Sequence, residues 1–122
     1  MLKAVGAVLF HSEDPLRVVR FYRDVLGLES SFGGEEGAEF RVGDVRIGLW
    51  QHSKLHGSAR DPDRVIVNFV VDDAIAEYEL LRRRGVDFIK PPTDEDWGGT
   101  LVALATFRDP DGNFLQLLQF KG

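Results

Sequence analysis

The sequence predicts an α+β protein built from two consecutive β-α-β-β-β modules. A helix that begins at an Asp and stops at a Gly occurs twice with equal length, since Gly27 follows Asp14 by 13 positions and Gly85 follows Asp72 by 13 positions. In each module a later strand pair is joined by a Gly/Asp turn, Gly43-Asp44 and then Asp111-Gly112. Two small sheets that each bury one helix can curve together into an eight-stranded, cup-shaped mixed sheet with the helices outside.

The first module is predicted from its start and stop signals and from apolar alternation. Asp14 is expected to cap a helix that has Pro15 at its first position and ends at Gly27. The apolar side chains of that helix recur at helical spacing, and Tyr22 is among those expected to pack inward. The predicted strands of this module are residues 4–11, 28–32, 40–42 and 45–50.

The second module repeats the pattern after a polar linker at about residues 53–63, which contains Gly57 and Pro62. Asp72 or Asp73 is expected to cap a helix that runs to about Arg84. The predicted strands are residues 65–71, 86–90, 100–107 and 114–120, and the segment 91–99 that starts at Pro91-Pro92 is predicted to be a loop. We therefore expect one domain over residues 1–122, with modules at about 1–52 and 64–122.

Composition excludes several kinds of site. The chain has 122 residues, a net charge of −5 and no cysteine. Disulfides, thiolate zinc sites, iron–sulfur clusters and a Cys nucleophile are therefore excluded. An acidic surface disfavours binding to nucleic acid or to an anionic membrane. No segment approaches the ~20 apolar residues of a transmembrane helix, so we expect a cytoplasmic protein.

Three segments in order, HSEDPLRVVRFYRDVLGLE, VDDAIAEYELLRRRGV and FRDPDGNFLQLLQ, resemble the vicinal oxygen chelate superfamily. That superfamily includes glyoxalase I, extradiol dioxygenases and bleomycin resistance proteins. The resemblance covers nearly the whole chain and implies paired βαβββ modules, a homodimer, and a cup that holds either a divalent metal or an organic ligand.

The resemblance also implies where a metal would be bound. The ligand positions of metal-using relatives correspond here to Ala7, Gly48, Ile66 and Gln116. Only Gln116 can donate an electron pair, whereas a divalent cation needs about three or four protein ligands. We therefore expect no metal and no other cofactor.

Polar and aromatic residues that remain on the expected inner wall are the candidate ligand-binding residues. Strand alternation places several of them on the same face as the lost metal positions. Trp97, in the predicted loop, resembles the Trp-Gly that flanks the ligand in bleomycin resistance proteins. The candidates are His11, Trp50, His52, Asn68, Trp97 and Gln116.

The leading hypothesis is a metal-free protein that binds a small organic molecule in an apolar, aromatic-lined cup. One alternative is a lyase, isomerase or dioxygenase that uses a metal relocated to His11, His52 and Gln116, or His11 as a general base. Another is a regulatory or structural module. The acidic residues 94–96 are either a solvated loop or an attraction for a cationic ligand.

Overall fold

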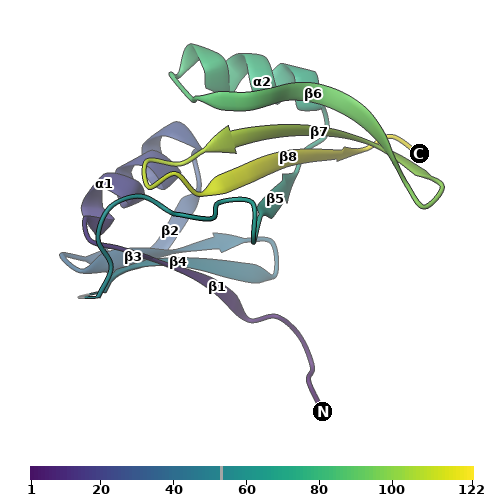
Figure 1. The fold of residues 1–122 in the computed structure, drawn as a ribbon. Helices are drawn as coiled ribbons and strands as arrows, with labels where there is room; N and C mark the ends of the chain where they lie inside the picture. The colour runs from purple at the N-terminus through teal and green to yellow at the C-terminus, as the bar shows by residue number, and fades with distance from the viewer. Residues whose placement is uncertain (53) are drawn as a thin grey trace. The chain divides into compact units, whose positions relative to one another are not determined.

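The computed structural model describes residues 1–52 and 54–122. The chain divides into two compact units, Met1–Gly57 and Ser58–Gly122. Each unit contains one four-stranded mixed sheet and the helix that follows its first strand. The predicted α+β class and the two βαβββ modules are therefore confirmed (Figure 1). The boundary between the units lies within the predicted linker, of which Ser53 is outside the described residues.

The first unit is built around a sheet with the strand order β1-β4-β3-β2, in which β1 and β4 are parallel. Its elements are β1 (Ala7–Ser12), α1 (Pro15–Arg20), the π-helical segment η1 (Phe21–Val25), β2 (Glu29–Gly34), β3 (Gly37–Val42) and β4 (Val45–Gln51). The Asp14 carboxylate caps α1 by accepting the Arg17 N–H at 3.4 Å. Gly27, with φ of 75°, ends the helical segment as predicted.

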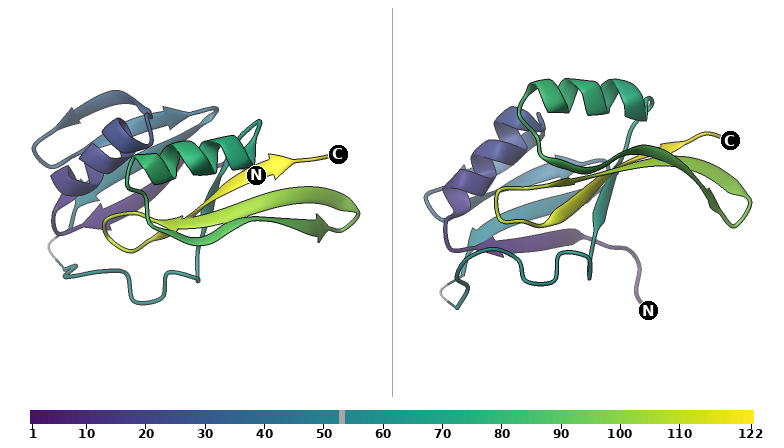
Figure 2. Two further views of the ribbon diagram at one scale, coloured as in Figure 1. Left: turned by 90° about the horizontal axis from the view of Figure 1, so that it is seen from above. Right: turned by 45° about the horizontal axis from the view of Figure 1, so that its top comes forward.

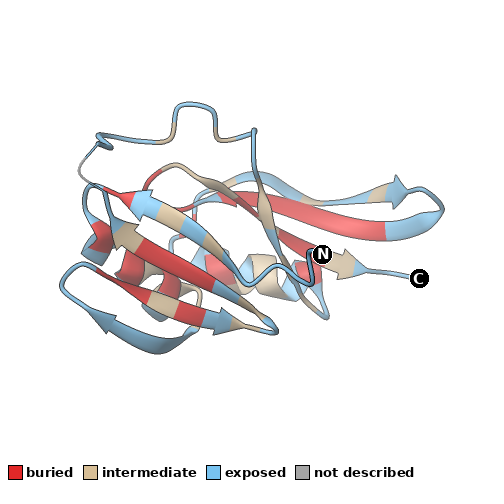
Figure 3. Cartoon of the chain, turned by 90° about the horizontal axis from the view of Figure 1, so that it is seen from below, coloured by how far each residue is buried: buried red, intermediate tan, exposed pale blue. Residues whose placement is uncertain are grey.

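One side of this sheet is covered by α1 and η1. Tyr22 is fully buried, and its ring centroid lies 6.1 Å from that of Phe10 and 6.3 Å from that of Phe40. Ile47 and Leu49 of β4 are buried on the same side, next to α1. The core of this unit therefore lies between the helix and β1, β3 and β4, while β2 is exposed along its length (Figure 3).

The second unit repeats the arrangement with the strand order β5-β8-β7-β6 (Figure 2). Its elements are β5 (Val67–Val70), α2 (Ala74–Arg83), β6 (Phe88–Trp97), β7 (Thr100–Arg108) and β8 (Phe114–Phe120). Asp73, and not Asp72, caps α2 by accepting the N–H groups of Ile75 and Ala76. Tyr78 of α2 packs edge-on against Phe88, with ring centroids 4.7 Å apart. Within the described residues, no helix has the length and apolar character needed to cross a bilayer.

The predicted loop at residues 91–99 is wrong, because most of it belongs to β6. β6 is an edge strand, so the missing N–H groups of Pro91 and Pro92 cost no hydrogen bond to a second neighbour. Register shifts between Phe88 and Thr93 accommodate the two prolines in the pairing with β7. The strand then continues to Trp97, and the turn that follows is Gly98-Gly99.

Candidate functional site

The sheet of the first unit has one face that α1 does not cover, which we call its open face. Side chains alternate along each strand, so the residues between those buried under α1 point to this face. The open face consists of Ala7, Leu9 and His11 of β1, Arg46, Gly48 and Trp50 of β4, Gly37, Glu39 and Arg41 of β3, and Glu29, Phe32 and Gly34 of β2.

Strand register arranges these residues in three rows across the sheet. The first row is Ala7, Arg46, Arg41 and Glu29; the second is Leu9, Gly48, Glu39 and Phe32; the third is His11, Trp50, Gly37 and Gly34. Successive rows are two residues apart along a strand, which is about 7 Å. The open face therefore has a charged row, a mixed row and a row dominated by one indole.

Trp50 lies over the two glycines that neighbour it. A Cβ atom at Gly48 would come within 2.7 Å of the indole Nε1 and 2.8 Å of the Leu9 Cδ2. A Cβ atom at Gly37 would come within 2.8 Å of the indole Cε3 and would collide with the Leu49 carbonyl oxygen. The space in which a side chain at position 48 would begin is thus filled by Trp50 and Leu9.

Phe32 extends this apolar surface onto β2. Its ring centroid lies 5.7 Å from that of Trp50, with the ring planes inclined by 36°. Phe32 and Leu9 are each 56% exposed, and Trp50 is half-buried. An exposed group of two aromatic rings and a leucine on one face is typical of a binding surface.

Two histidines lie beside Trp50. His11 is opposite Trp50 in the β1–β4 register, and its ring meets the His52 ring edge-on at 5.3 Å between centroids. His52 Nδ1 accepts the Lys54 N–H at 3.1 Å. The structure therefore brings together three of the predicted site residues, His11, Trp50 and His52.

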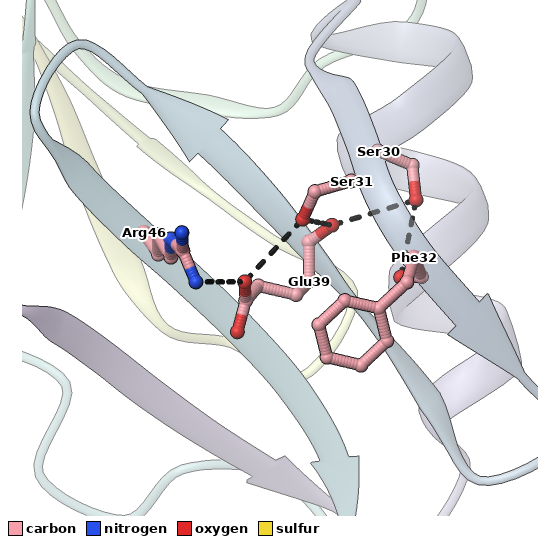
Figure 4. A network of polar contacts seen from close by, with 5 residues as sticks. All are labelled: Ser30, Ser31, Phe32, Glu39 and Arg46. Atoms are coloured by element: carbon pink, nitrogen blue, oxygen red, sulfur yellow. Dashed lines mark hydrogen bonds and ion pairs between the residues drawn. The ribbon is translucent and has the colours of Figure 1, made fainter.

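One ion pair of the open face is centred on Glu39, whose side chain is 14% exposed. Arg46 Nη1 donates to Glu39 Oε1 at 3.2 Å, and the Ser31 hydroxyl donates to the same oxygen at 3.3 Å. Figure 4 shows Arg46 and Ser31 converging on this carboxylate, with Phe32 beside it on β2. Ser31 reaches Glu39 because a register shift between Ser30 and Phe32 interrupts the regular β2–β3 pairing.

The other predicted site residues belong to the second unit. Asn68 of β5 is exposed and lies opposite Gln116 of β8, which in turn lies opposite Thr106 of β7. The Gln116 amide donates to the Thr106 hydroxyl at 3.3 Å. These residues form a neutral polar row of two amides and one hydroxyl.

Trp97 is distant from that row. It pairs with Thr100, six residues along β7 from Thr106, which corresponds to about 20 Å. The acidic residues beside it are already bonded. Asp94 pairs with Lys121 at 3.0 Å, Glu95 with Lys90 at 3.8 Å, and Asp96 accepts the Gly99 N–H. These bonds favour the solvated interpretation of this acidic cluster over the attraction of a cationic ligand.

The residues at the family's metal positions do not fit a metal. Ala7 carries no donor, Gly48 has its side-chain space filled by Trp50, and Ile66, just before β5, is apolar. Gln116 offers a neutral amide that is bonded to Thr106. In the part of the chain that the structure describes, no three side chains of His, Asp or Glu gather closely enough to hold a metal ion.

Glu13, which follows β1, forms hydrogen bonds with two residues that follow β4, His56 and Gly57. Its carboxylate accepts the Gly57 N–H at 3.1 Å and lies 3.2 Å from His56 Nδ1. The hydrogen bond from Gly57, and then that from His56, lowers the pKa of the Glu13 carboxyl below its ordinary value of 4.5. A lowered pKa in the folded protein means that the charged carboxylate stabilises the fold above the unfolded pKa.

We therefore expect Glu13→Gln to lower the urea midpoint at neutral pH. The difference from the wild type should shrink as the pH falls from about 4.5 through the folded pKa, because protonation then removes the same charge from the wild type. Urea unfolding of both proteins between neutral and acid pH measures this difference. A difference that does not change with pH would show that the Glu13 charge makes no contribution.

Several residues of the open face were not expected from the sequence, among them Phe32, Gly37, Glu39, Arg41 and Arg46. Gly37 could have been found, since a two-residue turn at Gly43-Asp44 fixes the β3–β4 register and sets Gly37 opposite Trp50. Arg41 follows from the same register. Phe32 carried no such signal, because its side depends on the irregular pairing at Ser31.

Comparisons with known proteins agree with this architecture. Residues 5–117 match the family model of the Glyoxalase/Bleomycin resistance protein/Dioxygenase superfamily. The uncharacterized protein YetH of Bacillus subtilis (strain 168) is 23% identical over 124 residues, covering 96% of this chain and 98% of YetH.

Two solved structures show the same fold. A glyoxalase/bleomycin resistance protein/dioxygenase from Nocardioides has a TM-score of 0.80 at 23% identity, covering 98% of this chain and 85% of that one. A member of the superfamily from Sphaerobacter thermophilus has a TM-score of 0.76 at 22% identity, covering 97% and 98%. The chain belongs to the glyoxalase/bleomycin resistance protein/dioxygenase superfamily.

Proposed function

We propose that this protein binds a small aromatic molecule on the open face of the first unit without the help of a metal ion. One observation carries the proposal: the Trp50 indole occupies the space above Gly48, where a metal-binding side chain would begin. Because residue 48 is a glycine and has no metal-binding side chain, the Trp50 indole can occupy this space and present an aromatic surface there.

The surroundings of Trp50 support an organic ligand. Phe32 and Leu9 extend the apolar surface, and His11 and Glu39 lie at its margin. Small-molecule sites generally combine aromatic side chains with a few polar groups that orient the ligand. Bleomycin resistance proteins, which share the superfamily, suggest sequestration as the purpose.

A homodimer is part of this proposal, and light scattering of the purified chain tests it.

The test is a titration with 2-naphthalenemethanol, a neutral two-ring probe, followed by the indole N–H signals in ¹H–¹⁵N spectra. The chain has two tryptophans, so the variant Trp97→Phe assigns the remaining signal to Trp50. We expect the Trp50 signal to shift in a saturable way. Phe32→Ala should weaken binding about tenfold, because it removes one of two contacting rings.

The matched control is Phe120→Ala in the second unit, since Phe120 and Phe32 are both 56% exposed. This variant should bind the probe as the wild type does. Shifts confined to Trp97, or equal losses in both Phe variants, would contradict a site at Trp50. An unshifted Trp50 signal at saturating probe would also contradict it.

A further inference from the structure

We propose that the ligand of this face is an aromatic anion, with its ring against Phe32 and Trp50 and its negative group at Arg41. The inference rests on the proposed function, because it assigns the chemistry of the same ligand. The aromatic contacts do not involve the two arginines of the first row, Arg41 and Arg46.

Arg41 and Arg46 lie directly opposite each other on β3 and β4. Like charges opposite each other in a sheet repel, and the two arginines differ in how that repulsion is offset. Arg46 pairs with Glu39 at 3.2 Å. For Arg41 no ion pair is found among the described residues, although Glu29 lies opposite it on β2. The Arg41 guanidinium therefore keeps N–H donors that are available to the negative group of a ligand.

The surface beside Arg41 is hollowed. An open hollow of about 300 Å³ is lined by Glu29, Ser30, Ser31 and Arg41. This volume is at the lower end of the roughly 300–1,000 Å³ of small-molecule sites. An exposed guanidinium has five N–H donors in a planar array that matches a carboxylate or phosphate group.

The hollow and the aromatic surface are adjacent. Arg41 is two residues along β3 from Glu39, and Glu39 lies opposite Phe32. The separation along the strand is therefore about 7 Å, which the long arginine side chain can shorten. A two-ring aromatic acid fits this spacing, with its rings at Phe32 and its acid group toward Arg41.

The experiment compares three probes of one shape by the Trp50 indole signal: 2-naphthoate, 2-naphthalenemethanol and 2-naphthylmethylammonium. We expect 2-naphthoate to bind about tenfold more tightly than the neutral probe, and the cation to bind most weakly. Arg41→Gln should abolish the preference for the anion while leaving affinity for the neutral probe unchanged. Arg83→Gln, which removes an exposed arginine of α2, should leave the preference intact.

Each outcome decides one of the two proposals. If the neutral probe binds and 2-naphthoate gains nothing, or if Arg41→Gln keeps the preference, the inference is wrong and the proposed function stands. Tighter binding of the cation would likewise overturn the inference alone. If none of the probes shifts Trp50, the proposed function itself fails. The spectra of Arg41→Gln also report whether the variant is folded.

Discussion

Gly37→Ala is expected to destabilise the protein by about 2–6 kcal/mol, the sum of backbone strain and overpacking. Gly37 has φ of +147°, a conformation that residues with a side chain rarely adopt. Its added Cβ would collide with the Leu49 carbonyl oxygen and would lie 2.8 Å from the Trp50 ring. The carbonyl belongs to the β4 backbone, so the strand itself must move.

Urea unfolding measures this loss, and Gly34→Ala is its control. Gly34 pairs with Gly37 in the same hairpin, but a Cβ there would meet nothing within 4 Å. We expect this variant to change the free energy of unfolding by no more than about 0.5 kcal/mol. Equal effects of the two substitutions would show that the contact between Gly37 and β4 is not as described.

Gly48→Ala is expected to cost about 1–3 kcal/mol, because its Cβ would force the Trp50 indole out of place. The Leu9 methyl that it also meets can rotate away, whereas the indole is rigid and is held against Phe32. In a Trp97→Phe background, the Trp50 indole signal should shift along with the loss of stability.

A double-mutant cycle with Trp50→Ala isolates this contact. Without the indole, Gly48→Ala should be neutral or stabilising, since Gly in a strand interior costs about 0.5–1 kcal/mol relative to Ala. The coupling energy between the two positions should therefore be about 1–3 kcal/mol. A coupling near zero would mean that Trp50 does not lie over Gly48.

Much of the fold follows from local signals in the sequence. The capped helices and the turn at Gly43-Asp44 fixed the order and type of the elements, and the two modules were predicted from them. The same turn sets the β3–β4 register, from which the neighbours of Trp50 can be read.

The remaining features depend on tertiary context. The two prolines at positions 91 and 92 indicate a loop in isolation, but β6 tolerates them because it is an edge strand. The bulge at Ser31, which brings Ser31 to Glu39, has no local sequence signal. The π-helical turn at Phe21–Val25 was predicted as ordinary helix, because the two share the same apolar spacing over so short a segment.

Of the six candidate residues, strand alternation correctly predicted the grouping of three in the first unit. These three, His11, Trp50 and His52, lie together. In the second unit, Trp97 at the end of β6 is far from Gln116 of β8. The loss of a donor at position 48 is visible in the sequence. The position of the Trp50 indole above Gly48 depends on side-chain packing, and the sequence pattern alone does not specify it.

Metal analysis distinguishes an open face that holds an organic ligand from one that holds a metal ion. The purified chain is incubated with excess Zn²⁺, Ni²⁺ or Mn²⁺, dialysed extensively, and its bound metal is measured by mass spectrometry. With the space above Gly48 filled by Trp50, we expect far less than one ion per chain to remain. Retention of about one ion per chain would show that the chain does hold a metal site, since tight binding needs about three or four protein ligands.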